Sequence, residues 1–314
     1  MPVSLDLIQS IQAQSKLSIS KAISLVENET ALGDELISDL FQYTGNAFRL
    51  GITGPPGAGK SSLTNQLISS FRKENKKVAI IAIDPTSPFS GGAVLGDRIR
   101  MTKHYADSNV YVRSMASRGS QGGLANQAEH VGDIFDAAKY DVIIYETVGV
   151  GQIELDIMQT TDTVIVVLVP ESGDEIQMIK AGLMEIGNIF AINKSDRPGA
   201  NKLSISLQNL LTSSSIDVGS WQCPVVQTIA TEGRGLIQLM ENITAHLKFN
   251  LKAGQHIVKN DNRYGRQLNA YLDKNFQQKF WNEKRCILFK NEMKKNQEER
   301  LSPFLFSKKL LNND

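Results

Sequence analysis

One short run of residues has the composition and spacing of a phosphate-binding loop. It reads GPPGAGKS from Gly54 to Ser61 and fits the pattern G-x-x-x-x-G-K-[ST], with an apolar strand-like stretch before it and a helical stretch after it. Glycines allow backbone N–H groups and the start of the helix to face a phosphate. Lys60 should therefore reach the β and γ phosphates as a catalytic residue, and the Ser61 hydroxyl should ligate Mg²⁺. A glycine-rich turn without a ligand is the alternative, and both flanking elements argue against it. The predicted nucleotide contacts are Gly54, Pro55, Pro56, Gly57, Ala58, Gly59, Lys60, Ser61 and Ser62.

A second motif, Asn193-Lys194-Ser195-Asp196, predicts which base is bound. It follows the apolar run IFAI, and an N-K-x-D loop at a strand end places the Asp196 carboxylate against N1–H and the 2-amino group of guanine. Asn193 should brace the loop, and Lys194 should stack along the ring. Adenine lacks the 2-amino group and carries a lone pair at N1, so a buried Asp196 would repel it. A chance surface turn is the alternative, but the position on a later strand of the same sheet favours guanine.

Three acidic residues form a predicted magnesium site together with Ser61. Asp84 ends the apolar run VAIIAI, Asp97 follows in the loop GGAVLGD, and Glu146 ends the run DVIIYE. Carboxylates at the C-terminal ends of parallel strands open into the crevice where such sheets bind ligands, and they can hold Mg²⁺ or its waters. Glu146 is one methylene longer than the aspartate of an ordinary D-x-x-G element, which favours a water-mediated contact over direct coordination. A helix cap or a solvated loop charge is the alternative for each.

The elements that must position these residues are indicated by periodicity. Residues from about Leu5 to Tyr43 have helical spacing, and short apolar runs then alternate with helical stretches. This predicts an α/β fold: a mostly parallel P-loop sheet with helices on both faces, plus N- and C-terminal helical extensions. The expected divisions are 1–46 for a helical extension, 47–250 for the P-loop domain and 251–314 for a helical arm. The expected strands are FRLGIT, VAIIAI, VYVR, DVIIYE, TVIVVLV, IFAIN and PVVQTIA.

Composition excludes several classes of function. Among 314 residues, 34 basic and 33 acidic side chains nearly cancel, so no global field argues for nucleic acid or an anionic membrane. The two cysteines are far apart and the four histidines lack ligand spacing, which argues against a disulfide framework or a zinc site. No apolar run approaches the roughly 20 residues of a membrane span. We expect a cytoplasmic protein without nucleic-acid or membrane partners.

Five runs occurring in this order resemble the MeaB/ArgK family of P-loop GTPases: GITGPPGAGKSSL, AIDPTSPFSGGAVLGDRIRM, YETVGVGQIELDI, GDEIQMIKAG and INKSD. The resemblance covers roughly Ile19 to Leu247. It implies GTP hydrolysis that is slow alone and faster with a partner, and GTP or GDP as ligand with Mg²⁺. The implied partner is an adenosylcobalamin-dependent methylmalonyl-CoA mutase or a related acyl-CoA mutase, whose cofactor loading and protection the GTPase would gate. It also implies a homodimer.

The resemblance further implies a mobile switch in the run GDEIQMIK, with Asp174, Gln177 and Lys180 as catalytic residues in partner-stimulated hydrolysis. Lys180 would place a positive charge near the transferred phosphoryl group, as an arginine finger does. Its alternative is a solvated helix lysine. Gln152 is a candidate for orienting water, and Gly149 would allow the switch peptide to flip.

Two segments depart from the family pattern. The loop expected to contact the base through Ala230 reads IATEG from Ile229, where the family usually has a Ser-Ala pair. The segment 262–314 does not follow the family either. It is expected to be an exposed charged helix, a dimerisation arm or a surface-binding segment.

Two other functions are weighed against this one. A kinase that phosphorylates a periplasmic amino-acid transport protein would prefer ATP, and Asn193 and Asp196 argue against it. A GTPase that delivers nickel or another metal would need a His/Cys-rich tract, and the sequence has none.

Overall fold

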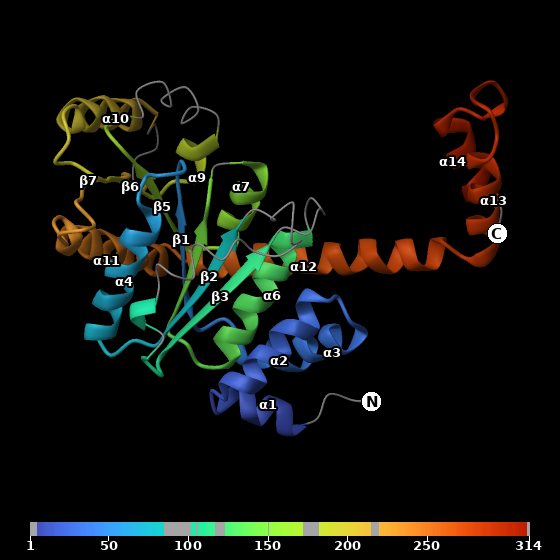
Figure 1. Ribbon diagram of the computed structural model, residues 1–314, viewed down its shortest axis with the longest axis horizontal. Coiled ribbons are helices and arrows are strands. Elements are labelled where there is room, and N and C mark those ends of the chain that lie inside the picture. Colours follow the sequence, from blue (N-terminus) through green and yellow to red (C-terminus); the bar gives the residue numbers. More distant parts are fainter. Residues whose placement is uncertain are drawn as a thin grey trace. The chain divides into compact units, whose positions relative to one another are not determined.

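The computed structural model describes residues 5–84, 102–104, 106–116, 123–149, 151–171, 182–214 and 220–312. The chain divides into two compact units, which we call the large unit (Met1–Asn260) and the small unit (Asp261–Asp314). Figure 1 shows the sheet with its helices in the large unit and further helices in the small one. In the described part of the chain, no helix is both long enough and apolar enough to cross a membrane.

The described residues of the large unit form a seven-stranded sheet in the order β3-β2-β4-β1-β5-β6-β7, and neighbouring strands pair in parallel. Ile52 of β1 and Ala82 of β2 both lie beside Glu146 of β4, so the C-terminal ends of these strands are level. The strands are β1 (Phe48–Thr53), β2 (Val78–Asp84), β3 (Val110–Ala116), β4 (Val142–Thr147), β5 (Thr163–Leu168), β6 (Ile189–Ile192) and β7 (Val225–Gln227).

Helices cover both faces of this sheet because successive strand residues point to opposite sides. Ile80 packs into a core under α4 and α11, and its neighbour Ile81 packs into the core on the other face. That second core also contains α6, α7 and α10. The sequence-based prediction of a parallel α/β sheet with helices on both faces is therefore confirmed. These helices are α4 (Lys60–Lys73), α6 (Gly123–Ala137), α7 (Gln152–Met158), α9 (Met184–Ile186), α10 (Ala200–Ser214) and α11 (Leu236–Lys252).

The N-terminal helices extend the second core. They are α1 (Leu5–Gln12), α2 (Lys16–Glu27) and α3 (Ala31–Leu40), followed by the 3₁₀ turn η1 (Phe41–Tyr43). The carboxylate of Asp136 on α6 accepts hydrogen bonds from the backbone N–H groups of residues 45–47, and Arg49 pairs with Asp133 at 2.6 Å. These buried contacts fix the point at which the chain enters β1, the strand that leads to the P-loop.

The small unit consists of short helices that follow a long one. Helix α12 (Gln255–Phe280) crosses the division between the units, and α13 (Glu283–Met293), η4 (Gln297–Glu299) and α14 (Pro303–Leu311) follow it. Arg285 on α13 is buried and donates to the carbonyls of Leu310 and Phe280. Buried Glu292 accepts from the N–H of Leu301. This segment, one of whose expected forms was an exposed charged helix, is thus a packed helical pair with buried charges.

Candidate functional site

The loop between β1 and α4 has a backbone that two of its glycines make possible. Gly54 has φ +142°, and a Cβ there would lie 2.1 Å from the Val167 carbonyl oxygen. Gly59 has φ +90°, and a Cβ there would lie 2.3 Å from Nδ2 of Asn193. A side chain at either position would collide with a neighbour, so these two glycines are required by close packing as well as by φ. The 14-residue helix α4 begins directly after this loop at Lys60.

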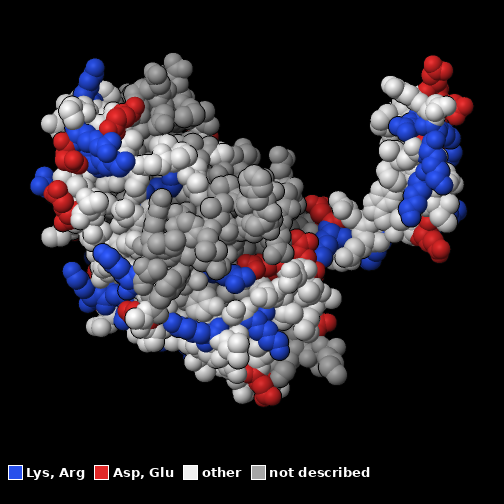
Figure 2. All heavy atoms as spheres, viewed as in Figure 1, with Lys and Arg blue, Asp and Glu red and all other residues white. Residues whose placement is uncertain are grey.

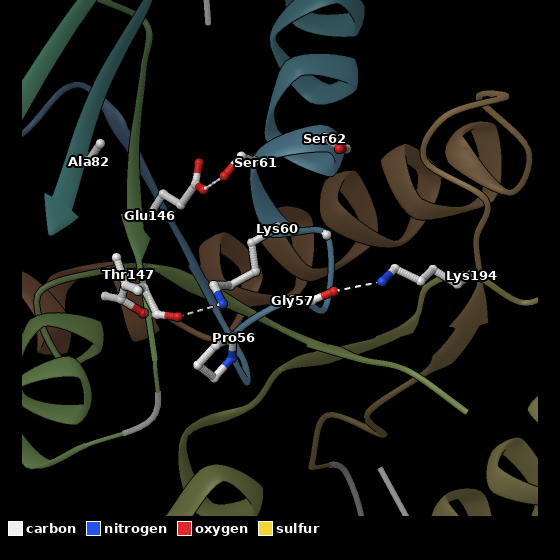
Figure 3. Close-up of a pocket in the computed structure, with 11 residues that line it drawn as sticks. Pro56, Gly57, Lys60, Ser61, Ser62, Ala82, Glu146, Thr147 and Lys194 are labelled. Carbon is white, nitrogen blue, oxygen red and sulfur yellow. Dashed lines mark hydrogen bonds between the residues drawn. The ribbon is translucent and has the colours of Figure 1, made fainter. Parts of the chain in front are cut away.

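Lys60 is buried at the centre of the site and holds three carbonyl groups. Its Nζ donates to Gly54 O at 2.7 Å, to Pro55 O at 2.8 Å and to Val148 O at 2.8 Å. Figure 3 shows this side chain turned back over the loop toward the end of β4. An ammonium group at this place, beside a helix N-terminus, gives the site the positive potential that a polyphosphate requires.

Ser61 and Glu146 meet beside Lys60. The Ser61 hydroxyl donates to Oε1 of Glu146 at 2.6 Å, and both residues are buried (Figure 3). A hydroxyl and a carboxylate oxygen are hard oxygen donors of the kind that Mg²⁺ takes, with one or two carboxylates and substrate phosphates completing its shell. The donor set therefore fits Mg²⁺. Among the residues that the structure describes, no group of three or more His, Cys, Asp and Glu side chains gathers as a metal cluster.

The segment after β4 is tied to β1 by two threonines that the sequence did not single out. Thr53 Oγ1 donates to Gly149 O at 3.1 Å, and Thr147 Oγ1 contacts both Thr53 Oγ1 at 3.0 Å and Gly149 O at 3.2 Å. The carbonyls of residues 148 and 149 thus face the P-loop strand and its lysine. This arrangement couples the T-V-G segment to β1 and to Lys60 of the P-loop.

Asn193 joins three parts of the site. Its Nδ2 donates to Ala58 O at 2.8 Å, while its Oδ1 accepts from the Ala230 N–H at 3.0 Å and from Thr228 Oγ1 at 3.3 Å. The side chain is buried, so these hydrogen bonds are protected from water. Lys194 has φ +55°, and its Nζ donates to Gly57 O at 2.8 Å. The predicted base-reading loop and the P-loop are therefore in direct contact.

Asp196 is exposed, whereas the sequence argument for base selection assumed a buried carboxylate. It follows Lys194 in a turn at the rim, where the side chains of neighbouring Arg197 and Glu171 form an exposed ion pair. In the protein without a bound base this carboxylate is therefore accessible to water. A bound base would have to cover the carboxylate for the full penalty against adenine to apply.

The structure places other predicted residues less completely. Asp84 ends β2 two residues beyond the position level with Glu146, and Gln152 begins α7; the side chains of both lie outside the described part. Four further predicted residues lie outside the described residues altogether: Asp97, Asp174, Gln177 and Lys180.

Two residues that sequence reasoning missed bind the loop containing Ala230. Gln66 on α4 donates from Nε2 to Ala230 O at 2.9 Å, and Thr228 contacts Asn193 as described above. Gln66 lies six positions after Lys60 and 164 residues from its partner, so no local pattern signals this contact. Only the packing of α4 beside α11, far along the chain, reveals it.

The residues of the P-loop and the end of β4 surround a cavity of about 500 Å³. This volume lies in the range of small-molecule and cofactor sites. Lys60, Lys194 and the start of α4 supply positive charge, while Ser61 and Glu146 add oxygen atoms to the lining (Figure 3). The residues that line the cavity are Pro56, Gly57, Gly59, Lys60, Ser61, Ser62, Ala82, Glu146, Thr147, Val148 and Lys194.

Comparison with known families finds one model that spans this site. Residues 19–285 match the family described as methylmalonyl-CoA mutase-associated GTPase MeaB. The match includes the P-loop, the end of β4, and the loop that begins at Asn193. It ends inside α13, so the last part of the small unit lies beyond it.

Individual relatives agree with this match. A Pyrococcus horikoshii protein described as a GTPase is 45% identical over 271 residues, covering 85% of each chain. The Escherichia coli GTPase ArgK is 35% identical and covers 75% of this chain and 73% of its own. A mitochondrial protein of Caenorhabditis elegans, described as a homolog of methylmalonic aciduria type A, is 35% identical over 60% of this chain and 51% of its own. Among solved structures, one described as a LAO/AO transport system kinase has a TM-score of 0.71 and 26% identity, covering 98% of this chain and 95% of that one.

Proposed function

Because the chain belongs to the MeaB family of P-loop GTPases, and so binds and hydrolyses GTP, we propose that its GTP cycle serves an adenosylcobalamin-dependent mutase. In this proposal the protein is a chaperone that gates loading and protection of the cobalamin cofactor. The client is methylmalonyl-CoA mutase or a related acyl-CoA mutase. The observation that carries the proposal is the family match over residues 19–285, and the name of the Caenorhabditis elegans relative supports it.

Mg²⁺ is the proposed metal of the hydrolytic site. Ser61 and Glu146 would hold it, since their oxygen atoms lie 2.6 Å apart in the lining of the cavity. Asp84 and Asp97 are proposed as its other protein ligands. When bound, Mg²⁺ neutralises charge on the β and γ phosphates. The short contact between the two oxygens supports their acting as one unit, because neither would have to travel far to share a cation.

We propose that Lys60 binds the phosphates of the nucleotide and that the base-reading residues bind its guanine. Lys60 and the start of α4 would orient the phosphates, and the contacts of Lys60 with three carbonyls support a fixed position for its charge. Asn193, Lys194, Asp196 and Ala230 would bind the guanine. Since Asn193 contacts both Ala58 and Ala230, it would hold the P-loop and the base-binding loop at a fixed distance from each other.

Partner-stimulated hydrolysis is proposed to depend on the run from Asp174 to Lys180. Docking of the mutase would bring this run to the phosphates, and Lys180 would add a positive charge to the transition state. Replacing Lys180 with Ala should abolish the stimulation and leave guanine affinity unchanged. Lys202→Ala, at an exposed position of α10, is the control. An unchanged stimulated rate in the Lys180 variant would exclude this role.

The small unit is proposed to make a homodimer through α12. Four large apolar side chains recur every four residues there and remain exposed: Tyr264 (55%), Leu268 (45%), Leu272 (43%) and Phe276 (67%). A spacing of four places them along one side of a helix, which is typical of a helix-packing surface. The double variant Leu268→Glu, Leu272→Glu should be monomeric by light scattering, whereas Gln278→Glu should behave as the parent. A monomeric parent would exclude the dimer.

The test of the proposed function is Mg²⁺-dependent hydrolysis of GTP and ATP, each with and without a purified adenosylcobalamin-dependent mutase. Guanine-selective turnover that rises with the mutase is the expected result. If turnover is selective for GTP but no such mutase changes its rate, the chaperone role is excluded and the GTPase activity still stands. The similarity to a solved structure described as a transport system kinase favours a second candidate, a kinase of that kind. That function requires ATP preference and transfer of phosphate to a protein, which the same assay detects with radiolabelled ATP.

A further inference from the structure

Both polar groups of the Ala230 backbone are held by side chains from outside its loop. The Ala230 N–H donates to Oδ1 of Asn193 at 3.0 Å, and its C=O accepts from Nε2 of Gln66 at 2.9 Å. Ala230 is only 4% exposed, so both hydrogen bonds lie in a region where water competes poorly. The two contacts together fix the orientation of the peptide groups on either side of this residue.

The loop itself is a tight turn whose outer part faces solvent. The N–H of Ile229 donates to Arg234 O at 3.1 Å and closes the turn, while Thr231 and Glu232 are exposed. A Cβ at Gly233 would lie 4.0 Å from Oε1 of Gln66, so the glutamine lies directly beneath the turn. Gln66 therefore contacts this turn at both Ala230 and Gly233.

Gln66 also connects this loop to the phosphate-binding end of the molecule. It belongs to α4, whose first residues are Lys60 and Ser61, and its neighbours Leu67 and Leu63 on the same helix are buried against the sheet. A helix anchored in this way is rigid, so a hydrogen bond from it limits movement of the loop. Asn193 provides the second connection, through Ala58 in the P-loop.

We propose that Gln66 is a positioning residue for guanine recognition: its amide fixes the Ala230 peptide, and nucleotide residence time and the preference for GTP over ATP depend on that hydrogen bond. The inference rests on the proposed role of Ala230 and Asn193 in binding the base. It goes beyond that role by assigning part of base selectivity to a residue of α4 that lies outside the predicted nucleotide contacts. Loss of one such hydrogen bond should accelerate release of GDP about three- to tenfold.

Two substitutions test this. Gln66→Met keeps an unbranched, helix-favouring side chain of similar length and removes the donor. Gln66→Glu places a carboxylate against the Ala230 carbonyl and should have a larger effect than Gln66→Met. Gln238→Met is the matched control, because Gln238 is an exposed glutamine on α11 close to the same turn. Release of fluorescent GDP, affinity for GTP and ATP, turnover at saturating GTP and the thermal midpoint are measured for each protein.

A positioning role predicts a specific pattern. GDP release accelerates in the order parent, Gln66→Met, Gln66→Glu, and GTP affinity falls by a similar factor. ATP affinity and turnover at saturating GTP stay within about twofold, since phosphate contacts that do not involve the base need no help from the turn. Gln238→Met matches the parent in every measurement.

Other outcomes are equally informative. Equal losses of GTP and ATP affinity would mean that Gln66 supports the P-loop helix instead, and would overturn the proposal. So would release rates in both variants that equal the parent's. If the parent itself fails to distinguish GTP from ATP, the base-reading role of residues 193–196 fails first, and that result is separable from a failure of Gln66 alone.

Discussion

The nucleotide end of the sheet and the small unit place polar and apolar groups in opposite ways. At the nucleotide end, buried polar groups meet across long stretches of sequence: Ser61 and Glu146 are 85 residues apart, and Asn193 and Ala58 are 135 apart. In the small unit the polar contacts of buried side chains span less of the sequence: Glu292 and Leu301 are nine residues apart, and Arg285 and Leu310 are 25 apart. Polar convergence over such distances, at the ends of parallel strands, marks a preorganised binding site.

Large apolar side chains are buried in the large unit and often exposed in the small one. The largest fully buried ones all lie in the large unit, whereas α12 to α14 expose many. The small unit is also basic, with twelve Lys and Arg against seven Asp and Glu in residues 261–314, and Figure 2 shows basic side chains gathered along its visible face. A small unit that leaves apolar surface outside its own core has the character of an interaction surface. The comparison therefore separates a region that performs chemistry from one suited to a partner.

The largest effect on the nucleotide end is expected from removing its buried charge. Lys60→Ala should lower GTP turnover about a thousandfold, because a fixed charge beside the transferred phosphoryl group is lost. Three carbonyls also lose their donor, so the thermal midpoint is measured alongside turnover. Lys73→Ala, at the exposed end of the same helix, should retain full activity. Turnover within tenfold of the parent in a folded Lys60 variant would contradict the assignment.

The second test concerns the small unit alone. Arg285→Met should destabilise it by about 3 kcal/mol, since two buried carbonyls lose a charged donor and the contact of the guanidinium with the Phe280 ring, at 4.6 Å, is lost. Unfolding by urea is followed through Trp281 in a Trp221→Phe background. Lys290→Met, at an exposed site one turn later, is the control. GTP turnover should be unaffected. A parallel loss of turnover would show that the two regions do not act separately.

Features that depend on local spacing can be predicted from the sequence, whereas contacts that depend on long-range packing cannot. The P-loop and the alternation of strands and helices follow from local spacing, and Glu146 could be placed near Ser61 because parallel strand ends share one edge. The contact of Gln66 with Ala230 could not be predicted, since it depends on the packing of α4 against elements far along the chain. In the small unit, Arg285 and Glu292 lie within a run of charges that is typical of a solvated helix. Their burial follows from the return of α14, which no periodicity indicates.

A third test uses pH, and it should affect the large unit alone. His246 is buried, its Nδ1 lies 2.7 Å from Thr163 Oγ1, and burial lowers its pKa to about 4, with Lys259 lowering it further and Asp162 opposing. In the unfolded chain the His246 imidazole has its ordinary pKa of 6.5. As the pH falls from 6.5 toward 4, the unfolded state therefore binds a proton that the folded state does not. Stability is therefore fully present above this window and is lost as the pH falls through it.

The expected loss is about 2 kcal/mol from about pH 7 to about pH 5. It is measured by urea unfolding in a Trp281→Phe background, where Trp221 reports because its ring lies 4.8 Å from that of His246. The variant His246→Asn removes this titration and should show a flatter pH dependence. A parent and variant with the same slope would mean that His246 is not the titrating group.

Helix caps occur with the same chemistry in both units, so the same small loss can be compared between them. Thr30 caps α3 in the large unit by accepting from the Gly33 N–H at 3.0 Å, and Asn282 caps α13 in the small unit by accepting from the Arg285 N–H at 2.9 Å. Replacing either with Ala should cost about 1 kcal/mol. The thermal midpoint should nevertheless fall by more in the small unit, by about 4–8 °C against about 2–4 °C, because a smaller domain has a smaller entropy of unfolding. Trp281 and Trp221 report the two midpoints separately. Equal shifts of the thermal midpoint in both variants would indicate that the two units unfold together. The small unit could then not be treated as independent of the nucleotide site.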